Sequence, residues 1–160
     1  MKRTHLFLRP LVFPALALLS LGILLGCGSK AEPAGDAAFK KDLETLQGVW
    51  TVVSMEQDGE PLAADRLSKI TLTIKGEHFT FDTGDDSHDG LYKIDPSNDP
   101  KELNIEITRG DEKGKVYLVI YKFEDGKMIQ CMQVSNKERP KEFTGKAGSG
   151  NLFEVWQRKN

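Results

Sequence analysis

The chain has 160 residues, with 22 Lys and Arg against 24 Asp and Glu, and its formal net charge is −2. This balance argues against nucleic-acid binding, which needs a basic face to neutralise phosphates. Two cysteines exclude a disulfide framework and a multi-cysteine metal site. The length fits one domain with a self-supporting core.

Residues 1–26 have the pattern of a secretory signal. Lys2 and Arg3 precede an uncharged, mostly apolar run over 11–25. The charge-free stretch is shorter than the roughly 20 residues of a membrane-spanning helix. The run ends in Leu24-Leu25-Gly26-Cys27, which resembles the bacterial lipobox. That resemblance implies that Cys27 carries a diacylglyceryl group and becomes the N-terminus of the mature chain.

Removal of residues 1–26 would also remove three basic residues and no acidic one. The remaining 134 residues would hold 19 basic and 24 acidic side chains, a net charge of −5. We expect this product to be anchored to membrane lipid through Cys27, in the cell envelope, with its domain on the periplasmic or surface face. Ordinary signal cleavage and an uncleaved membrane helix are the alternatives.

The segment that follows predicts a tether and a short helix. Residues 27–35 are small and polar, as in a flexible linker. Over 36–47, Asp36 can cap a helix whose apolar side chains Phe39, Leu43 and Leu46 share one face. Gly48 ends it. We expect this face to pack on the domain.

Residues 48–160 have the two-residue period of β-strands. We expect about eight, over 49–55, 70–75, 78–82, 90–95, 103–107, 116–123, 128–134 and 152–156, with a short helix over 63–68. The prediction is an all-β, antiparallel barrel, because closure hides the strand edges; a β-sandwich is the alternative. Large side chains assigned to the interior should leave little room, namely Trp50, Leu72, Phe79, Phe81, Tyr92, Ile105, Leu118 and Ile120.

Gly48-Val49-Trp50 looks like the G-x-W motif of lipocalins. The resemblance implies that Trp50 closes the barrel base and that Arg158 packs across it. A wider set of segments is similar to an uncharacterised lipocalin-like domain common in planctomycete bacterial lipoproteins, namely 46–50, Asp58-Gly59, 90–96, Pro100-Lys101, Ile120-Tyr121, Asp125-Gly126, Cys131 and 139–143. Asn104 departs from the aspartate expected there. The family implies a fold and no activity.

Three segments contain candidate functional residues. The acidic loop 82–90 resembles a calcium loop, but Pro96 stands where a bidentate glutamate is needed, so we expect a mobile, metal-free turn. Cys131 fits a small buried side chain better than a catalytic thiol. Arg139 and Phe143 are candidates for the barrel mouth, where arginine can bind a carboxylate. The alternative is a rigid connection in which Arg139 pairs with a local acid.

These features predict a membrane-anchored envelope lipoprotein that binds a small apolar or amphiphilic ligand at the open end of its barrel. The alternative is a non-catalytic protein-interaction module with a filled barrel. No catalytic motif, cofactor site or metal site is expected, and the sequence names no protein partner.

Overall fold

The computed structural model describes residues 34–135 and 137–159. The predicted signal peptide, lipobox and Cys27 lie outside these residues. In the part that is described, no helix is long and apolar enough to span a membrane.

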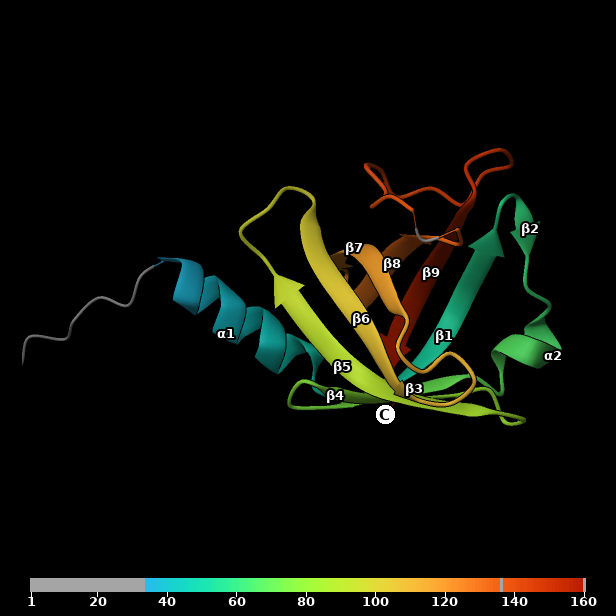
Figure 1. Cartoon of the computed structure of the whole chain (residues 1–160), viewed down its shortest axis with the longest axis horizontal. Helices are drawn as coiled ribbons and strands as arrows, with labels where there is room; N and C mark the ends of the chain where they lie inside the picture. The colour runs from blue at the N-terminus through green and yellow to red at the C-terminus, as the bar shows by residue number, and fades with distance from the viewer. Residues whose placement is uncertain (1–33, 136, 160) are drawn as a thin grey trace, which may run out of the picture. The chain divides into compact units, whose positions relative to one another are not determined.

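The domain is a closed antiparallel β-barrel of eight strands with one short extra strand (Figure 1). The short strand β2 pairs with β1, β1 also pairs with β3, each later strand pairs with the next, and pairing of β1 with β9 closes the sheet. The strands are β1 Gly48–Gln57, β2 Glu60–Pro61, β3 Thr71–Lys75, β4 His78–Asp82, β5 Ser87–Asp95, β6 Lys101–Arg109, β7 Val116–Glu124, β8 Lys127–Gln133 and β9 Asn151–Arg158. The lipocalin-like barrel is therefore confirmed, and the sandwich is wrong.

Two helices lie at opposite ends of the barrel. Helix α1, Ala34–Leu46, lies at the closed end, where Leu46 is buried and Phe39 and Leu43 pack against the core. It begins two residues before the expected cap, so Asp36 lies in its first turn, where a carboxylate favours the helix dipole. Helix α2, Ala64–Leu67, belongs to the connection 58–70 at the other end and adds Leu67 to the core.

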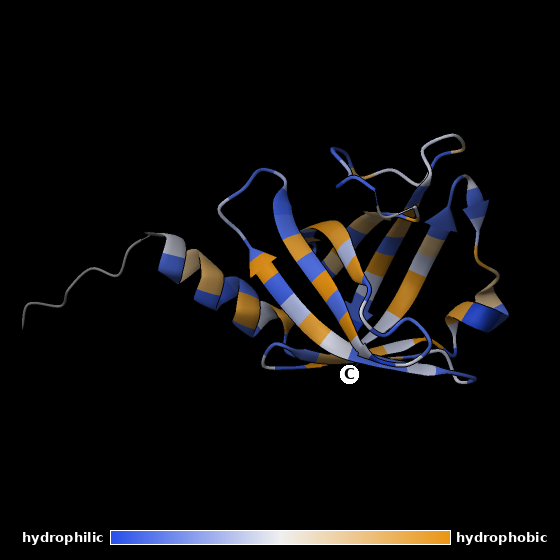
Figure 2. Ribbon diagram, viewed as in Figure 1, coloured by the Kyte–Doolittle hydropathy of each residue, from blue (hydrophilic) through white to orange (hydrophobic). Residues whose placement is uncertain are grey.

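Apolar and polar residues alternate along most strands, so one face of the sheet is apolar and turned inward (Figure 2). Strand β7 is apolar on both faces, and our prediction for its inward side chains is wrong. Tyr117, Val119 and Tyr121 face the core, whereas Leu118 and Ile120 face outward. The two-residue period cannot orient a strand whose faces are equally apolar.

The outer face of β7 is covered by the β8–β9 connection, 134–150, instead of by a helix. Arg139 of this segment donates from Nη1 to the Leu103 carbonyl oxygen at 2.9 Å, and the Cys131 thiol lies 3.5 Å from the Thr144 carbonyl oxygen. Ile120 and Cys131 are consequently buried on the outside of the barrel. The barrel therefore has two apolar layers on this side.

Candidate functional site

The base of the barrel is closed by Trp50. Its indole Nε1 donates to the Leu46 carbonyl oxygen at 2.8 Å, and the Arg158 guanidinium lies 4.6 Å from the ring centroid. Arg158 also donates to the carbonyl oxygens of Thr45 and Gln47, which ties the end of α1 to β9. Gly48 has φ +114°, and a Cβ there would lie 2.9 Å from Arg158 Nη1. The positive φ therefore favours glycine here, and a side chain would also shift the Arg158 guanidinium.

A buried carboxylate joins α1 to the wall next to the base. Asp42 Oδ2 accepts a hydrogen bond from the Tyr121 hydroxyl at 2.8 Å and lies 2.7 Å from Lys101 Nζ. Desolvation raises the pKa of Tyr121, and the hydrogen bond to Asp42 raises it further. The charge on Asp42 thus has both a cation and a donor as partners, as burial of a carboxylate requires.

The opposite end of the barrel contains an open cavity of about 420 Å³. This volume lies within the range of roughly 300 to 1,000 Å³ that small-molecule sites occupy. The large inward side chains therefore leave more room than expected, at the end of the barrel where we predicted a ligand to bind. Its lining comes from every strand of the closed barrel and from the adjoining loops, namely Gln57, Leu72, Phe79, Phe81, His88, Tyr92, Ile105, Ile107, Glu112, Lys115, Tyr117, Gln130, Met132, Val134, Leu152, Glu154 and Trp156.

Gly90 helps to leave this space open. It faces inward on β5, and a Cβ there would lie 2.5 Å from the Phe79 ring and 2.1 Å from the Glu106 carbonyl oxygen. The Phe79 ring can therefore lie close against the β5 backbone, with its centroid 4.8 Å from that of Tyr92. The aromatic rings form a wall of the cavity instead of a plug.

Glu154 is the buried ionisable group of the cavity. Only 4% of the residue is exposed, and its Oε2 accepts a hydrogen bond from Trp156 Nε1 at 3.2 Å. No ion pair joins it to a cation of the described chain. Burial raises the pKa of Glu154 to about 7, against the smaller opposite effect of the Trp156 hydrogen bond. The carboxyl group is therefore poised between its neutral and charged forms near neutral pH.

Gln130 pairs directly across the strands with Glu154 and is 1% exposed. Its Nε2 lies 3.3 Å from the Met128 sulfur, a weak acceptor, and its Oε1 has no hydrogen-bond partner. The amide also contacts the Tyr92 phenol, whose pKa is raised by burial. A buried carbonyl oxygen without a donor costs free energy that a ligand's donor can recover.

The rim of the cavity is charged but internally paired. Lys115 Nζ lies 2.6 Å from Glu112 Oε1, and this contact lowers the pKa of Glu112. His88 Nε2 lies 3.1 Å from an Asp86 carboxylate oxygen. Within the described chain, both basic side chains of the rim, Lys115 and His88, therefore lie next to a carboxylate.

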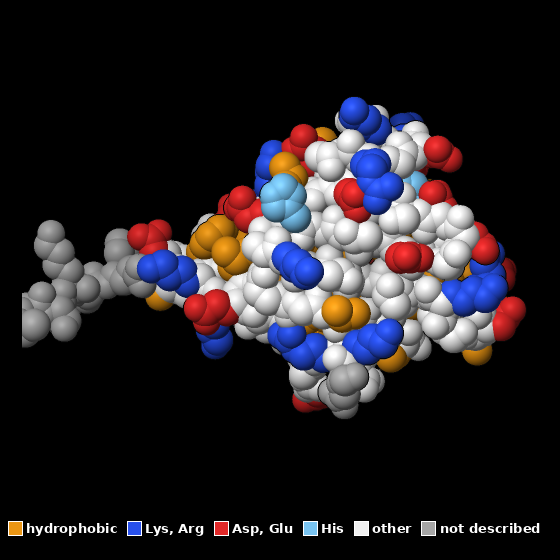
Figure 3. Space-filling model, turned by 90° about the horizontal axis from the view of Figure 1, so that it is seen from below, with side chains coloured by type: hydrophobic (Ala, Val, Ile, Leu, Met, Phe, Trp, Pro, Cys, Tyr) orange, Lys and Arg blue, Asp and Glu red, His pale blue; other side chains and the backbone are white. Residues whose placement is uncertain are grey.

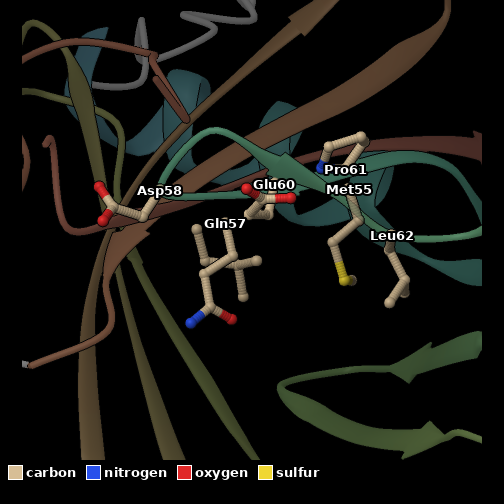
Figure 4. A pocket seen from close by; sticks show the side chains of 7 residues that line it. Met55, Gln57, Asp58, Glu60, Pro61 and Leu62 are labelled. Atoms are coloured by element: carbon tan, nitrogen blue, oxygen red, sulfur yellow. The ribbon is translucent and has the colours of Figure 1, made fainter. Parts of the chain in front are cut away.

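A second hollow, of about 570 Å³, lies beside the rim along the β1–β2 hairpin (Figure 4). It shares Gln57 and Leu152 with the cavity, and its other lining residues are Met55, Asp58, Glu60, Pro61 and Leu62. Several of these residues are exposed, and none carries a buried polar atom without a partner. The interior cavity is therefore the better candidate site.

Arg139 and Phe143 are not lining residues of the cavity. Arg139 lies on the outer wall, where Nη2 donates to Asn104 Oδ1 at 2.7 Å and Nε lies 3.1 Å from Glu102 Oε2. Phe143 packs nearby, with Lys122 Nζ 5.2 Å from its ring centroid. Arg139 therefore pairs with a local acid, Glu102, as the alternative expected, whereas Phe143 is not part of the core. Asn104 is another of the arginine's acceptors.

The acidic loop forms a tight turn with its own hydrogen bonds. Asp82 Oδ1 accepts from the Gly84 amide at 2.6 Å, and Asp86 Oδ1 accepts from the Ser87 amide at 2.7 Å. Asp89 turns away to the Arg109 guanidinium, which lowers its pKa. Among the described residues, no three His, Cys, Asp or Glu side chains converge as metal ligands would.

Sequence reasoning missed the polar pair Gln130 and Glu154. A signal was available, because both occupy inward positions between apolar residues, in Met128-x-Gln130-x-Met132 and Leu152-x-Glu154-x-Trp156. A polar side chain in an otherwise apolar inward row indicates a buried polar site.

Comparison of the chain with protein-family models, curated proteins and solved structures finds no match.

Proposed function

We propose that this protein is a non-catalytic envelope lipoprotein whose lipocalin-like barrel binds a small apolar or amphiphilic ligand. The observation that carries the proposal is the open cavity of about 420 Å³ with apolar and aromatic walls and a few buried polar groups. That combination is typical of small-molecule sites. A closed eight-stranded barrel, which can hold one small ligand, is compatible with this function.

The size of the cavity limits the ligand. At about 420 Å³ the cavity is near the lower end of the range of roughly 300 to 1,000 Å³ for small-molecule sites. A single small amphiphile fits this volume, whereas a full phospholipid does not. We expect the apolar part to contact Phe81, Ile107 and Met132.

The competing function, an interaction module with a filled barrel, has less support. The barrel is not filled at its open end, and the face seen from below has basic and acidic side chains interspersed, with no broad apolar patch (Figure 3). The large apolar residues exposed among the described residues are single valines, such as Val53 and Val116. Isolated apolar residues are ordinary features of a protein surface.

The proposed anchor depends on the lipobox and has its own test. The intact mass of the mature protein should show a diacylglyceryl group on Cys27 and the loss of residues 1–26. Cys27→Ser should release the protein from the membrane or leave it unprocessed. A mature protein without the lipid increment would refute the anchor while leaving the cavity's function open.

Ligand binding is tested by native mass spectrometry of the protein purified from its own envelope, before and after solvent extraction. We expect an adduct of small-molecule mass that extraction removes. Met132→Trp should weaken or abolish the adduct, because the larger ring occupies part of the cavity where the apolar part of the ligand is expected. Val53→Trp introduces the same ring at an exposed position of β1 and should retain the adduct. Absence of any adduct, together with failure to bind apolar fluorescent probes, would favour the interaction module.

A further inference from the structure

The polar groups of the cavity define the head group of the ligand, an inference that rests on the proposed function. We infer that the cavity binds amphiphiles with a protonated amine, which enters first and is held by Glu154 and Gln130. The apolar part of the ligand then lies against the aromatic and aliphatic walls nearer the rim.

The first argument is the balance of donors and acceptors around the cavity. The Trp156 indole donor is used by Glu154, and Gln130 Nε2 is directed to the Met128 sulfur. Two buried polar atoms of the lining remain without a partner, His88 Nδ1 at the rim and Gln130 Oε1, and the one that lies next to Glu154 is an acceptor, Gln130 Oε1. The Glu154 carboxylate also has acceptor capacity beyond its single hydrogen bond, since an ionised carboxylate can accept about four. The matching ligand group is therefore a donor.

The second argument is charge. The cavity contains a buried carboxylate with no ion-paired cation, and the one lysine that lines it, Lys115, is already paired with Glu112 at the rim. A carboxylate head group would therefore meet Glu154 without a compensating cation, which is unfavourable in a buried site. A protonated amine brings both the missing positive charge and three donors.

The neighbours of Glu154 contribute no competing cation. On β8 it faces Gln130, with Cys131 on the outer side of the same strand; on β1 its pairing partner is Met55. The other titratable residues that line the cavity are Tyr92 on β5, Tyr117 on β7, and the rim groups His88, Glu112 and Lys115. Glu154 is therefore the carboxylate that sets the charge of the inner cavity.

Binding should depend on pH in a defined direction. Because burial raises the pKa of Glu154 to about 7, the unliganded protein must release a proton before it can pair with an ammonium group. An alkylamine keeps its proton up to pH of about 10, like lysine. Affinity should therefore rise about tenfold per pH unit below 7 and level off between about 7.5 and 9.

The experiment compares three probes with one skeleton, namely phenylbutylamine, phenylbutanol and phenylbutanoate. Each is titrated calorimetrically into the purified full-length protein at pH 5.5, 6.5 and 8. We expect the amine to bind at least about tenfold more tightly than the alcohol at pH 8, with the carboxylate weakest. The affinity for the amine should fall about tenfold from pH 6.5 to 5.5.

Three variants locate the effect. Glu154→Gln keeps the shape and removes the charge, so it should lose at least about tenfold in amine affinity and abolish the pH dependence. Glu106→Gln removes a carboxylate from the outer face, where it pairs with Lys93, and should bind the amine as the wild type does. His88→Gln changes another side chain of the cavity lining and keeps Glu154, so it should retain the pH dependence.

The outcomes separate the inference from the proposed function. If the alcohol or carboxylate binds as tightly as the amine, or if Glu154→Gln binds the amine unchanged, the amine inference is overturned while the binding function stands. If none of the three probes binds, the amine inference is overturned, and the native mass measurement decides the binding function separately. Amine selectivity that disappears in Glu154→Gln and persists in Glu106→Gln supports both.

Discussion

The two ends of the barrel differ in whether their buried polar groups have hydrogen-bond and ion-pair partners. At the base, Asp42 has both a hydroxyl donor and an ammonium partner, and the Trp50 indole donates to a backbone carbonyl. In the cavity, Glu154 has one hydrogen bond and no ion-paired cation, and Gln130 Oε1 has no partner. The same sheet therefore contains a satisfied polar cluster at one end and an unsatisfied one at the other.

This difference separates stability from binding. Paired groups at the base fix helix α1 against the barrel and leave nothing for a ligand to satisfy. Unpaired groups in the cavity lower the stability of the unliganded protein, and a ligand with matching donors recovers that free energy. The cavity is thus the end at which bound ligand should stabilise the fold, and the base is the end at which mutation should damage it.

The largest effect is expected from Trp50→Ala at the base. Removal of this fully buried side chain should lower the free energy of unfolding by about 3 to 5 kcal/mol, because the loss of buried area is joined by a cavity that the barrel cannot close. Denaturant unfolding measures the change. Val53→Ala, at an exposed position of the same strand, should have little effect. A loss below about 1 kcal/mol for Trp50→Ala would place the tryptophan outside the folding core.

The second prediction concerns Glu154 and the pH dependence of stability. The pKa of this carboxyl is about 7 in the folded protein against 4.5 for the ordinary group, so between these values the folded state holds a proton that the unfolded state has released. Stability without ligand should therefore fall as pH rises from about 4.5 to 7 and then level off. At about 1.4 kcal/mol per pKa unit, this group contributes a loss on the order of 3 kcal/mol.

Glu154→Gln should remove this loss of stability. The free energies of unfolding of the variant and the wild type are compared by denaturant unfolding at two pH values. The variant should be more stable than the wild type at pH 8 by up to about 3 kcal/mol and should match it near pH 4.5. Glu106→Gln, on the outer face, should show no such difference between the two pH values. Equal stability of Glu154→Gln and the wild type at pH 8 would mean that the carboxylate has a cation or solvent to stabilise it.

The third prediction returns to the base. Asp42→Ala should cost about 2 kcal/mol, because it leaves the buried Tyr121 hydroxyl without its acceptor and Lys101 without its carboxylate. The cost is below that of a fully buried ion pair because Lys101 is partly exposed to solvent. Asp36→Ala, an exposed carboxylate in the first turn of the same helix, should change stability by less than about 0.5 kcal/mol. Similar costs for the two variants would indicate that the base cluster is not coupled to folding.

Much of the fold could be predicted because its signals are local. The eight expected strands all occur, and turns such as Asp125-Gly126, with positive φ at both residues, match the two-residue hairpins that this dipeptide favours. The resemblance to the G-x-W motif also predicts the contact between Trp50, near the start of the domain, and Arg158, near its end. Periodicity and turn chemistry need no knowledge of distant packing.

The cavity could not be predicted in the same way. Whether a barrel is filled depends on how large side chains lie across it, and Phe79 takes its position only because Gly90 on the next strand has no side chain. On the outer side of β7, Ile120 is buried and Arg139 of the β8–β9 connection donates to the Val119 carbonyl oxygen, a contact that the pattern of β7 does not reveal. Both features arise from contacts between strands or segments, whereas the sequence pattern describes one strand at a time.

The smallest predicted effect, Arg158→Lys, distinguishes the geometry of the base from its charge. Lysine keeps a cation near the Trp50 ring but lacks the planar guanidinium that donates to the carbonyl oxygens of Thr45 and Gln47. Because Arg158 is exposed, we expect a loss of about 0.5 to 1 kcal/mol in denaturant unfolding. Arg158→Ala should cost slightly more. The affinity for phenylbutylamine should not change, because Arg158 lies at the base and does not line the cavity. A weaker affinity with unchanged stability would show that the two ends of the barrel are coupled.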